Sequence, residues 1–109
     1  MSNDHLIEKL TNALDSLALG EGNIKERLIS VHSDLISIHP NEIPAEHKED
    51  WEWIQKQFTK LGPLTSPSGE VWVGSVENTM KKIHKSTGVK IAKKIYSMYW
   101  AVSSNEKYI

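Results

Sequence analysis

Residues 24–38 constrain the fold of this chain more than any other segment. Their apolar side chains recur at alternating spacings of four and three, which is typical of a helix with one buried face. Two further isoleucines, Ile29 and Ile36, lie about 120° around the same helix. A helix that is apolar over so wide an arc needs cover on two sides, so it is either the central helix of a bundle or half of a dimer seam. The first stripe consists of Ile24, Leu28, Val31, Leu35 and Ile38.

The same periodicity predicts helices before and after this one. Asn23 and Ser75 are expected to cap the second and fourth helices, and Pro44 suits the first turn of the third. Glycine-containing segments at 20–22, 62–63 and 86–88 are expected to separate the helices. Helices are predicted over residues 3–19, from 23, over 44–61, over 75–85 and from 89 to 103, with 104–109 as a frayed tail. The predicted inward residues are Leu6, Leu10, Ala13, Leu14, Leu17, Trp51, Ile54, Phe58, Leu61, Val76, Met80, Ile83, Ile91, Ile95, Met98, Tyr99 and Val102.

These elements predict an all-α fold, a four- to five-helix bundle in one domain over residues 1–109. One ordered loop is expected at about 62–75, where Glu70–Val73 could be extended and fold back over the bundle. The chain has no cysteine, which favours a reducing compartment. Neither a signal segment nor an apolar run of roughly 18 residues is visible, so we expect a cytoplasmic protein without a membrane association.

Charge is divided unevenly along the chain. Residues 1–53 carry eleven Asp and Glu against four Lys and Arg, a net of −7, whereas residues 54–109 carry nine Lys against three Glu, a net of +6. Two interpretations are open. The halves could form oppositely charged surfaces, with Glu42 to Glu52 as an acidic one, or they could pack together and match their charges within the molecule.

The basic half suggests a binding surface on the last two predicted helices. Their lysines lie outside the apolar stripes by helical geometry, and Tyr96 and Trp100 lie close to Lys93. Such a surface could attract phosphates and stack on bases, although all six positions are lysine, and arginine is the usual residue for bidentate contacts. The alternative is an ordinary solvated helical face. The six lysines are Lys81, Lys82, Lys85, Lys90, Lys93 and Lys94.

Tryptophan placement is a second indication of a docking surface. Trp51 belongs to a core stripe, but Trp53, Trp72 and Trp100 have no obvious core position. Exposed tryptophans are enriched at the energetic centres of interfaces. The alternative is that Trp72 packs over Trp53 beneath the loop.

Signatures of catalysis and of metal binding are missing from the sequence. There is no GxSxG, P-loop, dinucleotide-binding or HExxH motif, and no histidine follows a glutamate by three residues. We therefore expect a protein that is not an enzyme and that has no cofactor or bound metal.

Two segments, Leu17–Leu28 and Thr87–Ile95, resemble stretches of small uncharacterised bacterial helical proteins of about this length. The resemblance implies a bacterial setting and a helical fold, and it implies no activity.

The sequence thus predicts a binding module, an accessory or adaptor protein that docks an acidic partner protein. Nonspecific nucleic-acid binding through the same lysines is the alternative. Self-association through Ile29 and Ile36 would bury a second stripe that otherwise faces water. The predicted partner-binding residues are Lys81, Lys82, Lys85, Lys93, Tyr96 and Trp100.

Overall fold

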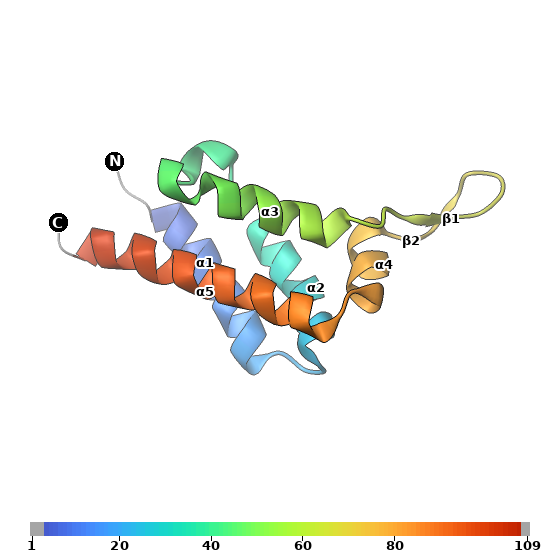
Figure 1. The fold of residues 1–109 in the computed structure, drawn as a ribbon, viewed down its shortest axis with the longest axis horizontal. Coiled ribbons are helices and arrows are strands. Elements are labelled where there is room, and N and C mark those ends of the chain that lie inside the picture. Colours follow the sequence, from blue (N-terminus) through green and yellow to red (C-terminus); the bar gives the residue numbers. More distant parts are fainter. Residues whose placement is uncertain (1–3, 108–109) are drawn as a thin grey trace.

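Five α-helices form the bundle, and a two-stranded hairpin extends from one end of it (Figure 1). The computed structural model describes residues 4–107, with side chains up to residue 104. The all-α class and the number of helices are confirmed. The elements are α1 (Asp4–Leu19), α2 (Ile24–Leu35), the 3₁₀ turns η1 (Pro40–Glu42) and η2 (Ala45–His47), α3 (Lys48–Thr59), β1 (Leu64–Thr65), β2 (Val71–Val73), α4 (Ser75–Lys82) and α5 (Lys85–Lys107).

α2 is the central helix. It packs against α1, α4 and α5, as the first interpretation of its wide apolar arc requires. Leu28, Val31 and Leu35 are fully buried there. Asn23 caps the helix as predicted, because its side-chain oxygen accepts a hydrogen bond of 3.0 Å from the Glu26 N–H.

The α1–α2 connection is held from both sides. Gly22 has φ +86°, a left-handed conformation that glycine adopts without a steric cost, and it turns the chain after α1. The Arg27 guanidinium on α2 donates a hydrogen bond of 3.0 Å to the Leu17 carbonyl, which is one of the last α1 carbonyls without a helical partner. The end of α1 is therefore fixed against α2.

α3 begins at Lys48, four residues after the predicted start at Pro44. Residues 40–47 form two 3₁₀ turns instead, and each follows or begins with a proline, which has no N–H to donate. Trp51, Ile54 and Phe58 are buried as predicted. Leu61 is exposed, contrary to the prediction, because α3 ends at Thr59 before the stripe reaches it.

The junction between α4 and α5 lies earlier than the sequence predicted. α4 ends at Lys82, the extended residue Ile83 follows, and the His84 carbonyl accepts from the N–H groups of Thr87 (3.0 Å) and Gly88 (3.1 Å) in the first turn of α5. At the other end of α4, Ser75 is the first helical residue and Gly74 is the cap residue, so the predicted Ser75 cap is wrong.

Gly88 lies within α5, in the segment that the sequence suggested as a turn. A Cβ at this position would lie 3.3 Å from Leu28 Cδ1 and 3.7 Å from Ile24 Cγ1. The glycine therefore allows α5 to approach α2 closely, and it does not break the helix. α5 continues to Lys107, past the predicted end at Ser103–Ser104.

Residues 64–73, here named the arm, form an antiparallel hairpin of β1 and β2 with a register shift between Leu64 and Thr65. The turn is closed by hydrogen bonds from the Ser66 N–H to the Glu70 carbonyl (2.7 Å) and from the Gly69 N–H to the Ser66 carbonyl (2.9 Å). The arm points away from the helices (Figure 1), so the expectation that this loop folds back over the bundle is wrong.

Candidate functional site

A shallow apolar hollow, here named the α1–α5 groove, lies between α1 and α5. Its volume is about 450 Å³. A second depression beside α2 and α4 has about 550 Å³, but five of its seven lining residues are charged or polar. The α1–α5 groove is therefore the better apolar docking site. It is lined by Leu14, Leu17, Ala18, Ile24, Val89, Ala92, Lys93 and Tyr96.

Small side chains explain why the groove is open. α1 and α5 are held together by buried stripes that include Leu10 and Ile95. Beside these stripes the two helices carry Ala18 and Ala92, whose methyl groups are too short to fill the space between neighbouring helices. An apolar surface that water covers in the free protein is a suitable binding surface for another apolar group.

An aromatic cluster lies on α5 at one end of the groove. The Tyr96 and Trp100 rings meet edge to face with centroids 6.1 Å apart, and Tyr99 and Trp100 do so at 5.5 Å. Tyr96 is 55% and Trp100 51% exposed, so both rings still present a large surface to solvent. The structure thus brings together three of the predicted site residues, Lys93, Tyr96 and Trp100, along one side of α5.

The predicted lysines of α4 lie elsewhere. α4 packs on α2 and α3 and does not run alongside α5 as the partner of a hairpin. Lys81 Nζ lies 3.1 Å from Glu77 Oε1, and the Lys81 carbonyl accepts a hydrogen bond of 2.9 Å from Lys25 on α2. Lys82 lines a hollow with Lys60 at the end of α3. These lysines are therefore separate from the α1–α5 groove.

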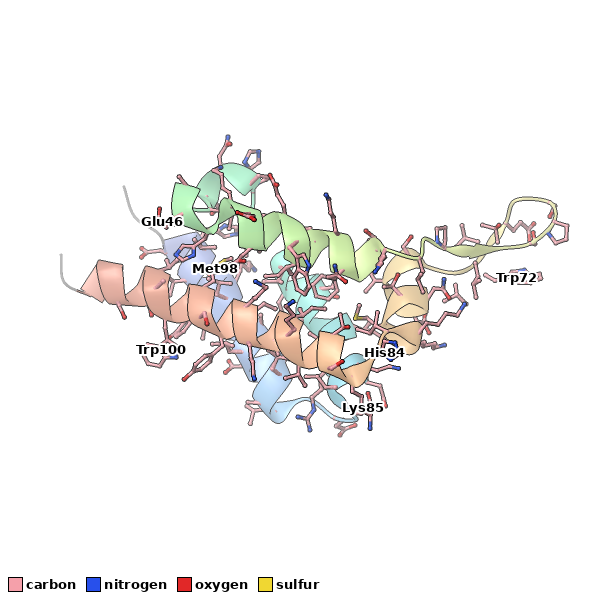
Figure 2. All side chains as sticks on the ribbon, in the orientation of Figure 1. Glu46, Trp72, His84, Lys85, Met98 and Trp100 are labelled. Carbon is pink, nitrogen blue, oxygen red and sulfur yellow. The ribbon has the colours of Figure 1, made fainter. Side chains whose placement is uncertain are left out.

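The lysines of α5 also face different directions. Lys85 is exposed at the start of the helix, and Figure 2 shows it far along α5 from Trp100. The ammonium groups of Lys90 and Lys94 each lie 5.3 Å from the centroid of the Trp53 ring on α3. Lys94 is held further by Asp50, 2.8 Å away. Only Lys93 among the predicted lysines lines the groove.

The four tryptophans have four different environments. Trp51 is buried, Trp53 is covered by the Lys90 and Lys94 cations, and Trp100 belongs to the aromatic cluster. Trp72 is 69% exposed on the arm, away from the helices (Figure 2). The alternative in which Trp72 packs over Trp53 is therefore wrong.

Glu42 joins the start of α1 to η1. Its Oε1 lies 2.6 Å from His5 Nδ1, and its Oε2 accepts a hydrogen bond of 2.7 Å from the His39 N–H. Desolvation by itself would raise the pKa of Glu42, but the His39 N–H and the nearby histidine rings outweigh it and hold the pKa below its usual value. The Glu42 carboxylate therefore connects α1 to η1 at this end of the bundle.

His32 packs between two helices of the bundle. Its ring lies 5.1 Å from the Phe58 ring, between α2 and α3. Burial lowers the pKa of His32, because the charged imidazolium loses hydration there. Among the described residues, no three His, Asp or Glu side chains converge in a way that could hold a metal ion.

Ile29 and Ile36, the pair suggested for self-association, differ in burial. Ile29 is partly buried and packs against the core, whereas Ile36 is 71% exposed just after the last turn of α2. The two side chains therefore do not form a continuous exposed stripe.

Comparison of the chain with models of protein families, with curated proteins and with solved structures gives no match. Within the part of the chain that the structure describes, no helix combines the length and the apolar character needed to cross a bilayer.

The groove residues that the sequence did not single out are Ala18, Val89 and Ala92. The sequence feature that could have indicated them is the position of the two alanines at the edges of apolar stripes. This feature is weak, because the sequence does not specify that the two helices pack together.

Proposed function

We propose that this protein is a non-enzymatic binding module, an accessory or adaptor protein of the bacterial cytoplasm, which docks an acidic partner protein in the α1–α5 groove. The observation that carries the proposal is the combination of an open apolar hollow, two half-exposed aromatic rings and one ammonium group along the same side of α5. Its occupant is an apolar segment of the partner with a carboxylate placed to meet Lys93.

The chemistry of the groove supports this occupant. Apolar side chains of the partner displace water from Leu14, Leu17 and Val89, which is the main favourable term in association. Half-exposed aromatic rings such as Trp100 are typical of residues that dominate binding energy. Lys93 at the rim adds a salt-sensitive attraction, which contributes more to the association rate and to specificity than to affinity.

Nonspecific nucleic-acid binding is less well supported by the positions of the lysines. Lys81 has Glu77 as its neighbour, and Lys94 is paired with Asp50. Phosphate binding through several lysines requires their charges along one path, and its affinity falls by orders of magnitude as salt rises. Docking in an apolar groove should lose only a small part of its affinity over the same range.

Site-specific photo-cross-linking in the native host tests the proposal. A benzophenone side chain at position 96 faces the groove, and a matched one at the exposed Lys56 position on α3 is the control. We expect an acidic protein to be captured from position 96 and not from position 56. The captured protein is then purified and its affinity measured with the Lys93→Glu, Trp100→Ala and Lys56→Glu variants.

The expected affinities follow from the groove chemistry. Lys93→Glu should weaken the purified complex several-fold, to about tenfold, and Trp100→Ala by about tenfold or more, whereas Lys56→Glu should leave it unchanged. Equal capture from both positions, or equal affinity of all variants, would overturn the proposal. Cross-linking of position 96 to nucleic acid would favour the alternative.

A further inference from the structure

The described part of the chain leaves large apolar side chains of the arm uncovered. The arm is a single two-stranded hairpin, and such a hairpin is marginally stable in water unless something packs against it. Val71 is 61% and Trp72 69% exposed, and adjacent strand residues point to opposite faces. Both faces of the arm therefore present apolar side chains to solvent.

The base of the arm is nevertheless held firmly. Asn78 and Thr79 on α4 are buried polar residues. Asn78 Nδ2 donates a hydrogen bond of 2.9 Å to the Gly62 carbonyl, and Thr79 Oγ1 accepts one of 3.1 Å from the Leu61 N–H. These bonds fix the point at which the chain leaves the bundle, so the arm is presented outward and not folded against its own helices (Figure 1).

We infer that the occupant of the α1–α5 groove is the arm of a second copy of this chain, with Trp72 in the apolar hollow and Glu70 beside Lys93. The exchange is reciprocal, so that each copy inserts its arm into the groove of the other around a two-fold axis. This inference rests on the proposed function, because it names the partner of the same groove.

Charge complementarity argues for a second copy. Glu70 directly precedes the two exposed apolar residues of β2, which is the acidic and apolar combination that the groove requires. Lys60 and Lys82 line a hollow at the base of the arm. By helical geometry the exposed residues Glu8 and Asp15 lie on one side of α1, about 60–80° around the helix from Ala18, and in the proposed dimer they are the carboxylates available to those lysines.

The contact is small, which sets the expected affinity. It is confined to two arms of ten residues each and the grooves that receive them, without contact between whole helical faces. We therefore expect a dimer that dissociates in the micromolar range or above.

A charge exchange between the two copies tests this arrangement. Glu70→Lys places two cations together in a homodimer, and Lys93→Glu places two carboxylates together. Each variant alone should dimerise several-fold to about tenfold more weakly than the wild type. In a 1:1 mixture both contacts join opposite charges, so the mixture should form a heterodimer about as well as the wild type forms its homodimer. Sedimentation equilibrium with one variant labelled measures this directly.

Two exposed apolar residues supply matched controls. Trp72→Ser should lower dimerisation by about tenfold or more, and Ile36→Ser, on the exposed end of α2, should leave it unchanged. Loss of the dimer with Ile36→Ser alone would overturn the inference in favour of an α2 seam. A wild type that stays monomeric up to millimolar concentration, or a mixture no stronger than either variant, would also overturn it.

Failure of this inference is distinguishable from failure of the proposed function. If the chain is monomeric but position 96 still cross-links to an unrelated acidic protein, the groove binds a partner and only its identity as a second copy is wrong. If position 96 captures neither this chain nor another protein, the proposed function fails as well.

Discussion

The Lys94 ammonium lies 2.8 Å from the Asp50 carboxylate and joins α5 to the first turn of α3. It connects the basic half of the chain to the acidic half, so part of the charge asymmetry of the sequence is matched within the molecule. The groove residue Lys93 is the next residue toward the N-terminus and lies about 100° around α5 from Lys94. Adjacent lysines thus have different surroundings, and their different roles can be tested separately.

A double-mutant cycle of Asp50→Ala and Lys94→Ala should give a coupling of about 0.5–1 kcal/mol in the free energy of unfolding, because both side chains are partly exposed and solvent screens their attraction. Urea denaturation provides the measurement. The matched cycle of Asp50→Ala with Lys93→Ala should give no coupling. Equal coupling in both cycles would contradict the positions of the two lysines.

The two tryptophans Trp51 and Trp72 should respond differently to truncation. Trp51→Ala removes a buried side chain from the core and should lower the free energy of unfolding by about 3–5 kcal/mol. Trp72→Ser on the exposed arm should change it by no more than about 0.5 kcal/mol at low protein concentration. A large loss with Trp72→Ser would indicate that the arm packs on the bundle.

Gly88→Val should destabilise the fold by about 1–3 kcal/mol, because its added methyl groups would meet Leu28 and Ile24 in the buried contact between α5 and α2. Thermal unfolding measures the loss. Ser97→Val, at an exposed position of the same helix, is the control and should have little effect. If the two variants unfold at the same temperature, the close approach at Gly88 is not required.

His32 should make stability dependent on pH below its ordinary pKa of 6.5. Burial lowers the pKa of His32 in the folded protein, so as the pH falls the unfolded chain binds this proton more readily than the folded one. The free energy of unfolding should therefore decrease in the window just below that value. His32→Gln should remove this part of the decrease in a series of denaturation curves between about pH 5 and 8. Identical slopes for the variant and the wild type would contradict the prediction.

The core could be predicted from the sequence because helical periodicity is a local property. The stripes of α1, α3 and α5 are buried as their spacing indicates, for example at Leu10, Phe58 and Ile95. Asn23 likewise caps α2, since a cap depends on residues only three positions apart.

The predictions were wrong where the structure around a residue depends on contacts with residues far away in the sequence. Gly88 resembles a turn residue, but it contacts Leu28, sixty positions away. The arm needs a pairing between β1 and β2, and the two residues of β1 are too few to be recognised as a strand. Leu61 is exposed because α3 ends at Thr59, and its N–H then donates to Thr79 Oγ1 on α4, eighteen positions away.

The candidate site was predictable only in part for the same reason. Lys93, Tyr96 and Trp100 follow from one helix, and the structure brings them together. The other wall of the groove belongs to α1, and no periodicity within α1 or α5 specifies that Ala18 and Ala92 line the same hollow.

Alanine methyl groups offer the most direct test that the α1–α5 groove is the docking surface. NMR spectra of the protein with labelled alanine methyl groups would first be recorded at low concentration. They would then be recorded with a saturating excess of unlabelled protein of the same sequence, or with the acidic protein captured at position 96. The account predicts that the Ala18 and Ala92 signals shift while that of Ala45, exposed on η2, stays in place. Unchanged Ala18 and Ala92 signals in a complex that has demonstrably formed would contradict it.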